Sequence, residues 1–349
     1  MSLLVRTTFL IGAGLLCFGC RTVCRMEEMV MGPIMARITV VSDRMSAEET
    51  ESVIRDAFAS IHKVDRLMSK YKKESDVSRL NRSDAGVWVE VDAMTFSVFE
   101  ESQRIAELTG GAFDVTALPL SSLWSFWPRG EPVVPSEEEI ERARSHVGYR
   151  KLSLNRSTRS LMKSDAETKV DLAGIAKGYA ADRAMEALRR KGVRDALVEI
   201  GGETRSMGKN KSGKPWRIGV LHPIKRGFLT ILELSNKAVA TSGDYMKFFV
   251  VEGKTYSHLI DPRTGRPISN DVCSVTVIAE NCTEADALAT AISVLGIEEG
   301  FKLIESLPAA EAIIARRVGE EGGIEVRVSS GLKGLSIPQE AERAPASAR

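Results

Sequence analysis

The sequence predicts an α+β protein with a mixed, largely antiparallel sheet flanked by helices, folded as a single large domain. Two observations carry this prediction. Strand-like apolar segments come in pairs joined by short turns, and these pairs are mixed with helical segments instead of alternating with them one for one. This order favours hairpins over the repeated strand–helix–strand units of a doubly wound parallel sheet. In addition, residues 36–335 contain no linker rich in Pro, Gly or Ser and no internal repeat.

The first half of the chain is predicted to be mainly helical. Arg37–Val41 is expected to form a strand, and Ser46–Glu49 has the sequence of a capping box that opens a helix. The apolar stripe of this helix contains Val53, Ala57, Ile61, Val64 and Met68. Further helices are predicted over Asp92–Leu108, which is followed by a pair of glycines, and near Glu137–Ser145.

The second half mixes strands with helices. A helix over Ile175–Arg190 is expected to lead into a strand over Ala196–Ile200. Further strands are predicted at Trp216–Leu221, Phe228–Leu234, Phe248–Val251, Thr255–Ile260 and Val272–Ala279. The two strands around Glu252-Gly253 have the pattern of a hairpin. A last helix is predicted from Thr283 to Leu295, closed by Gly296.

The composition and charge are those of an ordinary soluble globular protein. The 349 residues include 48 Lys and Arg against 47 Asp and Glu, a formal net charge of +1, and 43% are apolar. These values exclude collagen-like, low-complexity and largely disordered chains. They also argue against nucleic acid as a partner, because binding to a phosphate backbone is driven by an excess of basic charge.

The two ends of the chain differ from the rest. Thr7–Cys20 is uncharged and mostly apolar, and Arg6 precedes it. This segment is shorter than the ~20 residues of a transmembrane helix but suits an export signal. Residues 1–25 are therefore expected to be an export signal, with Cys20 as a candidate lipoprotein anchor and an uncleaved signal anchor as the alternative. Residues 26–335 are the expected domain, and residues 336–349 are expected to be a disordered tail.

Four segments contain residues that a hydrophobic core would not require. The first is Lys169–Gly178, where a short apolar stretch passes through small residues into a helix. The free N–H groups at a helix start attract anions, and Lys177 adds a full positive charge there, so the segment suggests a phosphate or diphosphate site. It lacks the spacing of a P-loop. The alternative is a tight strand-to-helix turn with a solvated lysine.

The second segment is Thr283–Thr290. Asp286 and Thr290 are four residues apart on one face of the predicted helix, so a carboxylate and a hydroxyl can both reach one cation. Ligands that are all oxygen favour Mg²⁺ over zinc. The alternative is ordinary helix capping, with Thr283 as the N-cap and Asp286 in the first turn.

The third and fourth segments are loops. Residues 261–265 (DPRTG) have the composition of a turn, and His258 stands at the end of the strand before it, where a side chain can face a cleft. The alternative for His258 is a structural role. Leu108–Thr116 is a glycine-rich exit from a helix, and its small residues with Asp114 could line a pocket or form a plain loop.

Taken together and in this order, the motifs resemble the ApbE family, the FAD:protein FMN transferases. The matching stretches are MSKYKKESDVSRLN (68–81), TGGAFDVT (109–116), LPLSSLWSFWP (118–128), VDLAGIAKGYAAD (170–182), LVEIGGE (197–203), AVATSGDY (238–245), HLIDPRTGRP (258–267) and ADALATAISVLG (285–296). The resemblance covers about residues 31–300 and implies an ApbE-like, T-fold-like sheet with flanking helices. The predicted export signal agrees with it, since many members are periplasmic lipoproteins.

The resemblance also implies a reaction and a set of site residues. Members bind FAD and, with Mg²⁺, transfer its FMN moiety to a threonine hydroxyl of an acceptor protein as a phosphodiester, releasing AMP. Contacts with FAD are implied for Met31, Tyr71, Ala112, Phe113, Asp114, Asp171, Lys177 and Ile260. Ligation of Mg²⁺ is implied for the Gly174 carbonyl and the side chains of Asp286 and Thr290. His258 is the candidate for activating the acceptor hydroxyl or steadying the diphosphate.

Two positions depart from the family pattern. Val115 stands where the family often has Pro, a change expected only to loosen a turn. Ala289 stands where a number of members have a second Asp on the metal-binding helix, so one Mg²⁺ is expected in place of two.

Two other functions compete with protein flavinylation. One is a Mg²⁺-dependent FAD pyrophosphatase that yields FMN and AMP, and the other is a non-catalytic flavin-binding lipoprotein. The presence of Lys177, His258, Asp286 and Thr290 argues against the latter, because binding alone would not need a metal at the diphosphate. The resemblance implies an acceptor subunit of the quinone-reductase or Rnf type, and a location on the periplasmic side of the inner membrane with an N-terminal anchor.

Overall fold

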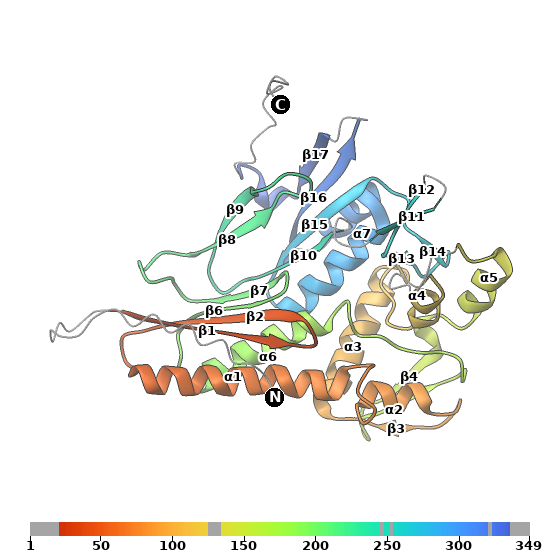
Figure 1. Ribbon diagram of the computed structural model, residues 1–349, viewed down its shortest axis with the longest axis horizontal. Helices are drawn as coiled ribbons and strands as arrows, with labels where there is room; N and C mark the ends of the chain where they lie inside the picture. Colours follow the sequence, from red (N-terminus) through yellow and green to blue (C-terminus); the bar gives the residue numbers. More distant parts are fainter. Residues whose placement is uncertain (1–20, 125–133, 244–247, 252–253, 320–322, 336–349) are drawn as a thin grey trace.

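The computed structural model describes residues 21–124, 134–243, 248–251, 254–319 and 323–335 (Figure 1). At its centre is an eight-stranded sheet in the order β1-β2-β6-β7-β10-β15-β16-β17, in which every neighbouring pair is antiparallel. Its strands are β1 (Thr22–Val30), β2 (Ile34–Ser42), β6 (Asp195–Ile200), β7 (Glu203–Met207), β10 (Ala238–Gly243), β15 (Val272–Ala279), β16 (Glu311–Val318) and β17 (Gly323–Val328). The predicted α+β class with a largely antiparallel sheet is confirmed.

Three helices cover one face of this sheet: α1 (Ala47–Met68), α6 (Ala176–Arg190) and α7 (Cys282–Glu305). The capping box predicted at the start of α1 is present, since Ser46 accepts from the Glu49 amide and Glu49 accepts from the Ser46 amide. The predicted apolar stripe of α1 is buried against α6 and the sheet. The site described below is built on α6 and α7 of this layer.

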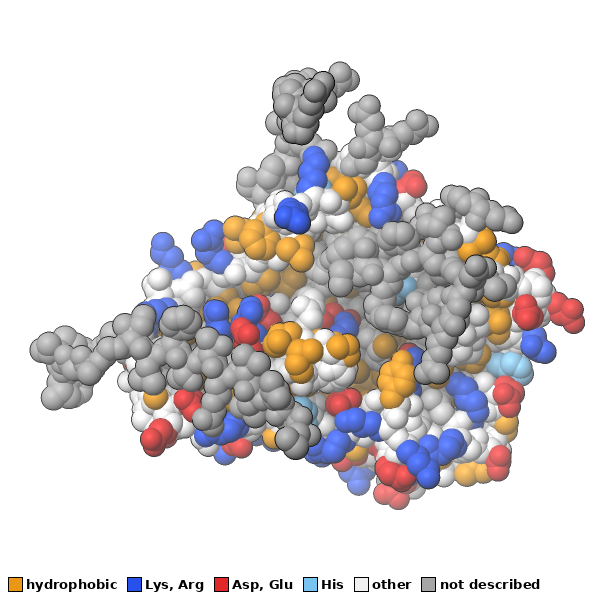
Figure 2. Space-filling model, viewed as in Figure 1, with side chains coloured by type: hydrophobic (Ala, Val, Ile, Leu, Met, Phe, Trp, Pro, Cys, Tyr) orange, Lys and Arg blue, Asp and Glu red, His pale blue; other side chains and the backbone are white. Residues whose placement is uncertain are grey.

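The opposite face of the sheet is covered by a hairpin of β8 (Trp216–Leu221) and β9 (Phe228–Leu234). Ile218 and Leu232 of the hairpin pack against Val239, Ile278 and Ile313 of the sheet. In Figure 2, acidic and basic side chains are interspersed over the visible face, in agreement with a net charge near zero.

The remaining elements extend the molecule beyond one end of the sheet (right in Figure 1). They are the helices α2 (Asp76–Arg82), α3 (Ala93–Leu108), α4 (Leu118–Trp124) and α5 (Glu137–Ser145), a small sheet of β3 (Val89–Glu90), β4 (Leu152–Asn155) and β5 (Ser160–Lys163), and the hairpins β11 (Phe248–Val251) with β12 (Lys254–Ser257) and β13 (Ile260–Asp261) with β14 (Arg266–Pro267). A separate apolar cluster of Leu120, Trp124, Ile140 and Ile260 joins α4, α5 and β13. The Trp124 indole also donates to the Gly265 carbonyl at 2.8 Å.

The structure corrects two predicted boundaries. The predicted strand Thr255–Ile260 is split, because β12 ends at Ser257 and the next strand starts at Ile260 in a different hairpin. The Leu259 amide turns to the Ser257 hydroxyl, so His258 lies in a two-residue link and not at the end of a strand. Asn281, not Thr283, is the N-cap of α7. The backbone leaves the helical region at Gly296 (φ 81°, ψ 179°), so the first helical segment closes there as predicted, and a second segment follows across the kink to Glu305.

The strand β1 lies partly inside the range predicted as export signal. It starts at Thr22 and pairs with β2 along its whole length, and its alternate residues Cys24 and Met26 pack on the core. The predicted domain start at residue 26 therefore falls in the middle of a strand. The strands β7, β10, β16 and β17 are not among the predicted elements either.

Both predicted terminal segments, Thr7–Cys20 and residues 336–349, lie outside the described residues. Within the described part of the chain, no helix is both long enough and apolar enough to span a bilayer.

Candidate active site

The site begins where α6 and α7 cross. The Gly178 amide near the start of α6 donates to Asp286 Oδ2 on α7 at 2.9 Å. In the other direction, Asp182 on α6 accepts from the Cys282 and Thr283 amides at the start of α7, at 2.9 and 2.8 Å. Each helix therefore supplies a carboxylate that satisfies free N–H groups at the start of the other, which is where a negative charge is most favourable.

This crossing depends on the absence of a side chain at residue 178. A Cβ on Gly178 would overlap the Cys282 carbonyl group and press on Cβ of Asp286. The two backbones consequently meet more closely than any other residue at this position would allow. The small residues of the sequence motif thus serve helix packing at this point.

Lys177 lies at the crossing with two carboxylates. Its ammonium group is paired with Glu203 at the start of β7 and lies 3.4 Å from Asp286 Oδ1. The Glu203 side chain is only 2% exposed and also accepts from the Gly202 amide at 3.1 Å. Lys177 is therefore held as a fixed charge inside the fold, and the alternative of a solvated lysine in a plain turn does not apply.

The pKa values follow from this arrangement. Burial raises the pKa of Glu203 to about 7, with Asp286 acting in the same direction and Lys177 against it. Burial works against the charge on Lys177, but the carboxylates of Asp286 and Glu203 outweigh it and raise the pKa of this lysine. One ammonium group is thus shared by two carboxyl groups, so the cluster has an excess of negative charge. A cation bound at Asp286 would neutralise this excess.

Gly174 lies next to Thr290, and Thr290 follows Asp286 by one turn of α7. The position of a Cβ on Gly174 would lie 3.5 Å from Thr290 Oγ1 and 3.3 Å from the Phe113 ring, so the loop before α6 touches α7 one turn after Asp286. The Gly178 amide, which would bond to the Gly174 carbonyl in a regular helix, is instead directed to Asp286. Among the hydrogen bonds of the described residues, none is accepted by the Gly174 carbonyl and none involves the Thr290 hydroxyl.

These oxygen atoms fit a hard divalent cation. One carboxylate, one hydroxyl and one backbone carbonyl are the ligand types that Mg²⁺ prefers, with water completing the shell. No group of three His, Cys, Asp or Glu side chains suited to a metal occurs among the described residues. A cation at this place would therefore be held by one carboxylate together with backbone and hydroxyl oxygen.

The residues predicted to contact FAD differ in their exposure: Tyr71 is exposed, whereas Ala112 and Phe113 are buried. Tyr71 is exposed over 84% of its surface, and the Lys70 ammonium lies 5.2 Å from its ring centre, so it offers a free aromatic face. Asp171 accepts from Lys70 Nζ at 2.7 Å and from the Ala173 amide at 3.1 Å. Ala112 and Phe113 are buried, and the Phe113 ring packs against Gly174.

Asp114 has partners inside its own loop. Its carboxylate accepts from the Thr116 amide and hydroxyl at 2.8 and 2.6 Å and from the Tyr149 amide at 2.6 Å. Burial raises the pKa of Asp114, and these three hydrogen bonds oppose the rise. In this structure the side chain holds the loop after α3 to the segment before β4, a role that the sequence did not indicate.

The other predicted residues lie in different elements. Met31, with φ of 49°, forms the turn between β1 and β2 and packs on the core. Ile34, three residues later, approaches Gly201 near the Lys177 side chain. Ile260 is buried in the cluster with Trp124, so its side chain is packed against α4 and α5. His258 is half-buried in the link between β12 and β13.

Sequence reasoning assigned no role to Glu203, Gly178 or Asp182. All three belong to stretches quoted for the family resemblance, Glu203 in LVEIGGE and the others in VDLAGIAKGYAAD. A buried acid beside two glycines is the signal that could have indicated Glu203. The pairings themselves join residues 26 and about 100 positions apart, which local patterns do not encode.

The chain was compared with known protein families and sequences. A family model described as the ApbE family matches residues 31–314. The FAD:protein FMN transferase of Vibrio cholerae serotype O1 is 42% identical over 249 residues, which cover 70% of this chain and 74% of the relative. That of Haemophilus influenzae is 35% identical over 310 residues, with coverage of 87% and 86%.

Solved structures give the same picture. The flavin transferase ApbE from Vibrio cholerae matches with a TM-score of 0.81 at 34% identity, over 90% of this chain and 100% of the other. The apo form of the Pseudomonas stutzeri flavinyl transferase ApbE matches with a TM-score of 0.81 at 34% identity, over 90% and 97%. The fold is thus that of the solved flavin transferases. The chain belongs to the ApbE family, and the resemblance drawn from the sequence motifs is confirmed.

Proposed function

We propose that this chain is a Mg²⁺-dependent FAD:protein FMN transferase. The observation that carries the proposal is the cluster at the α6–α7 crossing, where a fixed ammonium group stands beside oxygen atoms that suit a divalent cation. A diphosphate needs both kinds of charge beside it while one of its P–O bonds breaks. The names of the relatives support the flavin substrate and a protein acceptor.

The balance of the reaction is simple. The acceptor threonine oxygen forms a bond to the phosphorus of the FMN half, the anhydride bond to the AMP half breaks, and the threonine proton leaves. Gly174, Asp286 and Thr290 would hold Mg²⁺, which when bound would neutralise charge on the diphosphate. Ala289 supplies no carboxylate to this face, which supports a single ion.

The other residues act by position and charge. Lys177, fixed by Glu203, places a permanent positive charge beside the diphosphate. Tyr71 offers an aromatic face on which a flavin or adenine ring can stack, and Asp171 provides a carboxylate for nucleotide hydrogen bonds. His258 is proposed to take the threonine proton, because a neutral imidazole accepts a proton near neutral pH.

The test is to incubate the full chain with FAD, Mg²⁺ and a candidate acceptor subunit of the quinone-reductase or Rnf type. Flavin fluorescence on the denatured acceptor and free FMN are both followed. The proposal expects labelling that needs Mg²⁺ and stops when the acceptor threonine is replaced by valine. Release of FMN and AMP without labelling would establish the pyrophosphatase instead, and FAD binding without cleavage would leave a flavin carrier.

The proposed location is the periplasmic side of a bacterial inner membrane. It rests on the apolar segment Thr7–Cys20 with its preceding Arg6, and on Cys20 as the anchor. Mass spectrometry of the protein purified from its native membrane tests this directly, because a lipidated Cys20 would be the first residue of the mature chain. A chain that retains Met1 would instead indicate an uncleaved anchor.

A further inference from the structure

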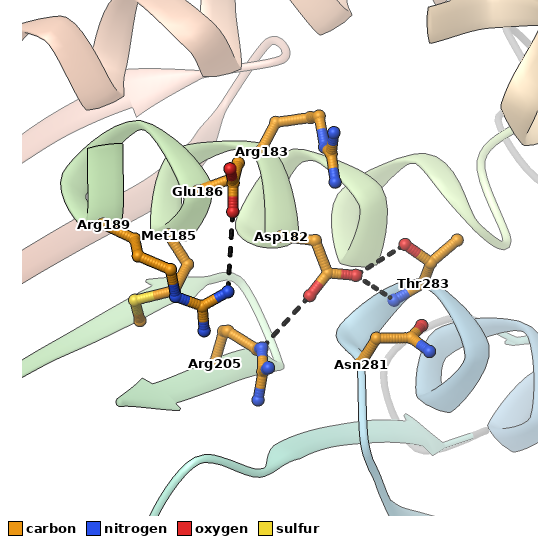
Figure 3. A pocket seen from close by; sticks show the side chains of 8 residues that line it. All are labelled: Asp182, Arg183, Met185, Glu186, Arg189, Arg205, Asn281 and Thr283. Atoms are coloured by element: carbon orange, nitrogen blue, oxygen red, sulfur yellow. Dashed lines mark hydrogen bonds and ion pairs between the residues drawn. The ribbon is translucent and has the colours of Figure 1, made fainter. Parts of the chain in front are cut away.

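A polar cavity lies on the same pair of helices, next to the α6–α7 crossing. It has a volume of about 270 Å³ and is bounded by α6, by Arg205 in the middle of β7 and by the N-terminal end of α7 (Figure 3). Its lining residues are Asp182, Arg183, Met185, Glu186, Arg189, Arg205, Asn281 and Thr283. Lys177, Asp286 and Thr290 are not among them. Since water occupies ~30 Å³ per molecule, the cavity has room for a small anion and several waters.

The acids that line this cavity already have partners. Asp182 accepts from two amides at the start of α7 and from the Thr283 hydroxyl at 2.6 Å. Glu186 is paired with Arg189 at 3.5 Å and with Arg190 at 3.3 Å. The lining therefore has three arginines against two acids, a net charge of one positive unit. Glu186 is in addition paired with Arg190, which is not among the lining residues.

Two of these arginines, Arg183 and Arg205, each have a buried side-chain nitrogen without a hydrogen-bond partner among the described residues. The Arg205 side chain is only 12% exposed, and its Nε lies 3.3 Å from Asp182 Oδ1. Its Nη1 atom is buried and has no hydrogen-bond partner among the described residues. A guanidinium N–H without an acceptor is unfavourable, so the Arg205 guanidinium has hydrogen-bonding capacity beyond its pairing with Asp182.

Two other groups complete the wall. Arg189 is paired only loosely, and its side chain is 54% exposed, so it is free to turn toward an occupant. The Asn281 side-chain oxygen caps α7 by accepting from the Glu284 amide at 2.8 Å, which leaves its amide N–H groups as donors. Arg183 adds positive charge to the cavity but is not expected to bind an anion directly. Its guanidinium stacks on the Tyr179 ring and lies on the other side of α6 from Arg205 (Figure 3).

We propose that this cavity binds a phosphate-type oxyanion through Arg205 and Arg189. Guanidinium groups pair with the oxygen atoms of phosphate in a two-pronged geometry, and a cavity whose acids are already paired has no comparable affinity for cations. The ligand chemistry has two sources, inorganic phosphate and the phosphate group of a mononucleotide such as AMP. The site is separate from the proposed transferase site, so either proposal can fail without the other.

The test is calorimetric titration of the full chain with inorganic phosphate and, in a second arm, with AMP and adenosine. Wild-type protein is expected to bind phosphate at one saturable site. Arg189→Gln should weaken binding roughly tenfold, the loss expected for one charge-assisted hydrogen bond, and Arg205→Gln should weaken it more. Arg156→Gln is the matched control, since Arg156 is 85% exposed and paired with Glu100 far from the cavity.

Arg189→Gln keeps the test decisive if Arg205→Gln does not fold, because Arg189 is largely exposed. Binding of AMP but neither adenosine nor inorganic phosphate, with the same loss in Arg189→Gln, would identify the nucleotide phosphate as the ligand. The proposal is overturned if wild-type protein binds neither phosphate nor AMP at millimolar concentration. It is equally overturned if Arg189→Gln and Arg205→Gln bind as wild type does, because the anion would then occupy another site, such as that of Lys177.

Discussion

The two ends of the proposed active site are built differently. The α6–α7 crossing is anchored in the main sheet, and its charged groups are buried and joined by backbone hydrogen bonds. The segment with His258 and Ile260 consists of two short hairpins, held by a small apolar cluster around Trp124. In the first region the charged side chains of Lys177, Glu203 and Asp286 are held in place by the fold without a ligand. The second region presents His258 on a two-residue link between strands.

This contrast assigns separate tasks to the two regions. Charges that act on a diphosphate are most effective when they are held in place by the fold, because no reorganisation is then needed during the reaction. A group that meets the side chain of another protein must instead lie where that protein can approach. The contrast predicts that damage to the crossing affects all FAD cleavage, whereas damage at His258 affects transfer.

The largest effect is expected for Asp286→Ala. This change removes the only carboxylate of the proposed cation site, so Mg²⁺-dependent cleavage of FAD should fall by more than about 10³-fold. Thermal unfolding should stay cooperative, since Lys177 keeps Glu203 as a partner. Glu284→Ala on the same helix, where the side chain pairs with Arg104, is the control and should retain activity. Full activity of Asp286→Ala would remove this residue from the site.

Gly178→Ala tests how tightly the crossing is built. The added Cβ would overlap the backbone of Cys282, and a backbone group cannot rotate away, so a loss of about 3 kcal/mol in unfolding free energy is expected. Urea denaturation measures it. Gly300→Ala is the matched change in α7, because its Cβ would meet Cγ2 of Ile292 at 2.6 Å but the nearest backbone atom only at 3.4 Å, and it should cost less. Equal losses in the two variants would show that the crossing is not specially close.

His258→Gln should separate the two regions. Transfer to the acceptor should fall by about 10²-fold, the usual contribution of a positioned base, while FAD binding and Mg²⁺ binding stay unchanged. His222→Gln, in the turn of the β8–β9 hairpin, is the control. Stopped assays of acceptor labelling alongside FAD titrations give both quantities. A parallel loss of FAD affinity would instead assign His258 to nucleotide binding.

The smallest effect concerns the pH dependence of stability. The pKa of Glu203 is about 7 in the folded protein against an ordinary 4.5, so the folded state binds more protons between these values. Stability of the metal-free protein should therefore fall as pH rises from 4.5 to 7, and Glu203→Gln should flatten this slope. One pKa unit corresponds to ~1.4 kcal/mol. The value of about 7 already includes the opposing effect of Lys177. Denaturation in EDTA across this range provides the test, and an unchanged slope would contradict it.

The sequence predicted the longer helices and fewer than half of the strands that the structure describes, and it did so where caps and apolar periods are local signals. Ser46 and Glu49 indicated the start of α1, and the strand Val272–Ala279 was predicted at its observed bounds. Strand β1 was missed because it does not alternate cleanly between apolar and polar residues: Val23 and Met29 are exposed, whereas Glu28 is half-buried. Had the chain been cut before Met26, half of that strand would have been lost.

The site was predictable as a set of residues but not as a set of bonds. Asp286 and Thr290 were found from their spacing on one helix, and Gly174 came from the family resemblance. The roles of Glu203 and Asp182 depend on which element packs beside which, and that is decided by the sheet order. For Asp114, the pattern showed a carboxylate in a loop but not that three donors of the loop and its neighbour would occupy it.

The early start of β1 also sets the length of any tether. Only Arg21 separates Cys20 from the first strand residue, and Arg21 is itself pinned by Asp195 and by the Asn210 carbonyl at 2.9 Å. An extended residue spans ~3.5 Å, so a lipid on Cys20 would hold the folded domain directly against the bilayer, because the linker between them is a single residue. Acceptors embedded in the same bilayer would then meet the enzyme by lateral diffusion, at a fixed height. Inserting a flexible spacer after Cys20 would change which acceptor threonines lie within reach.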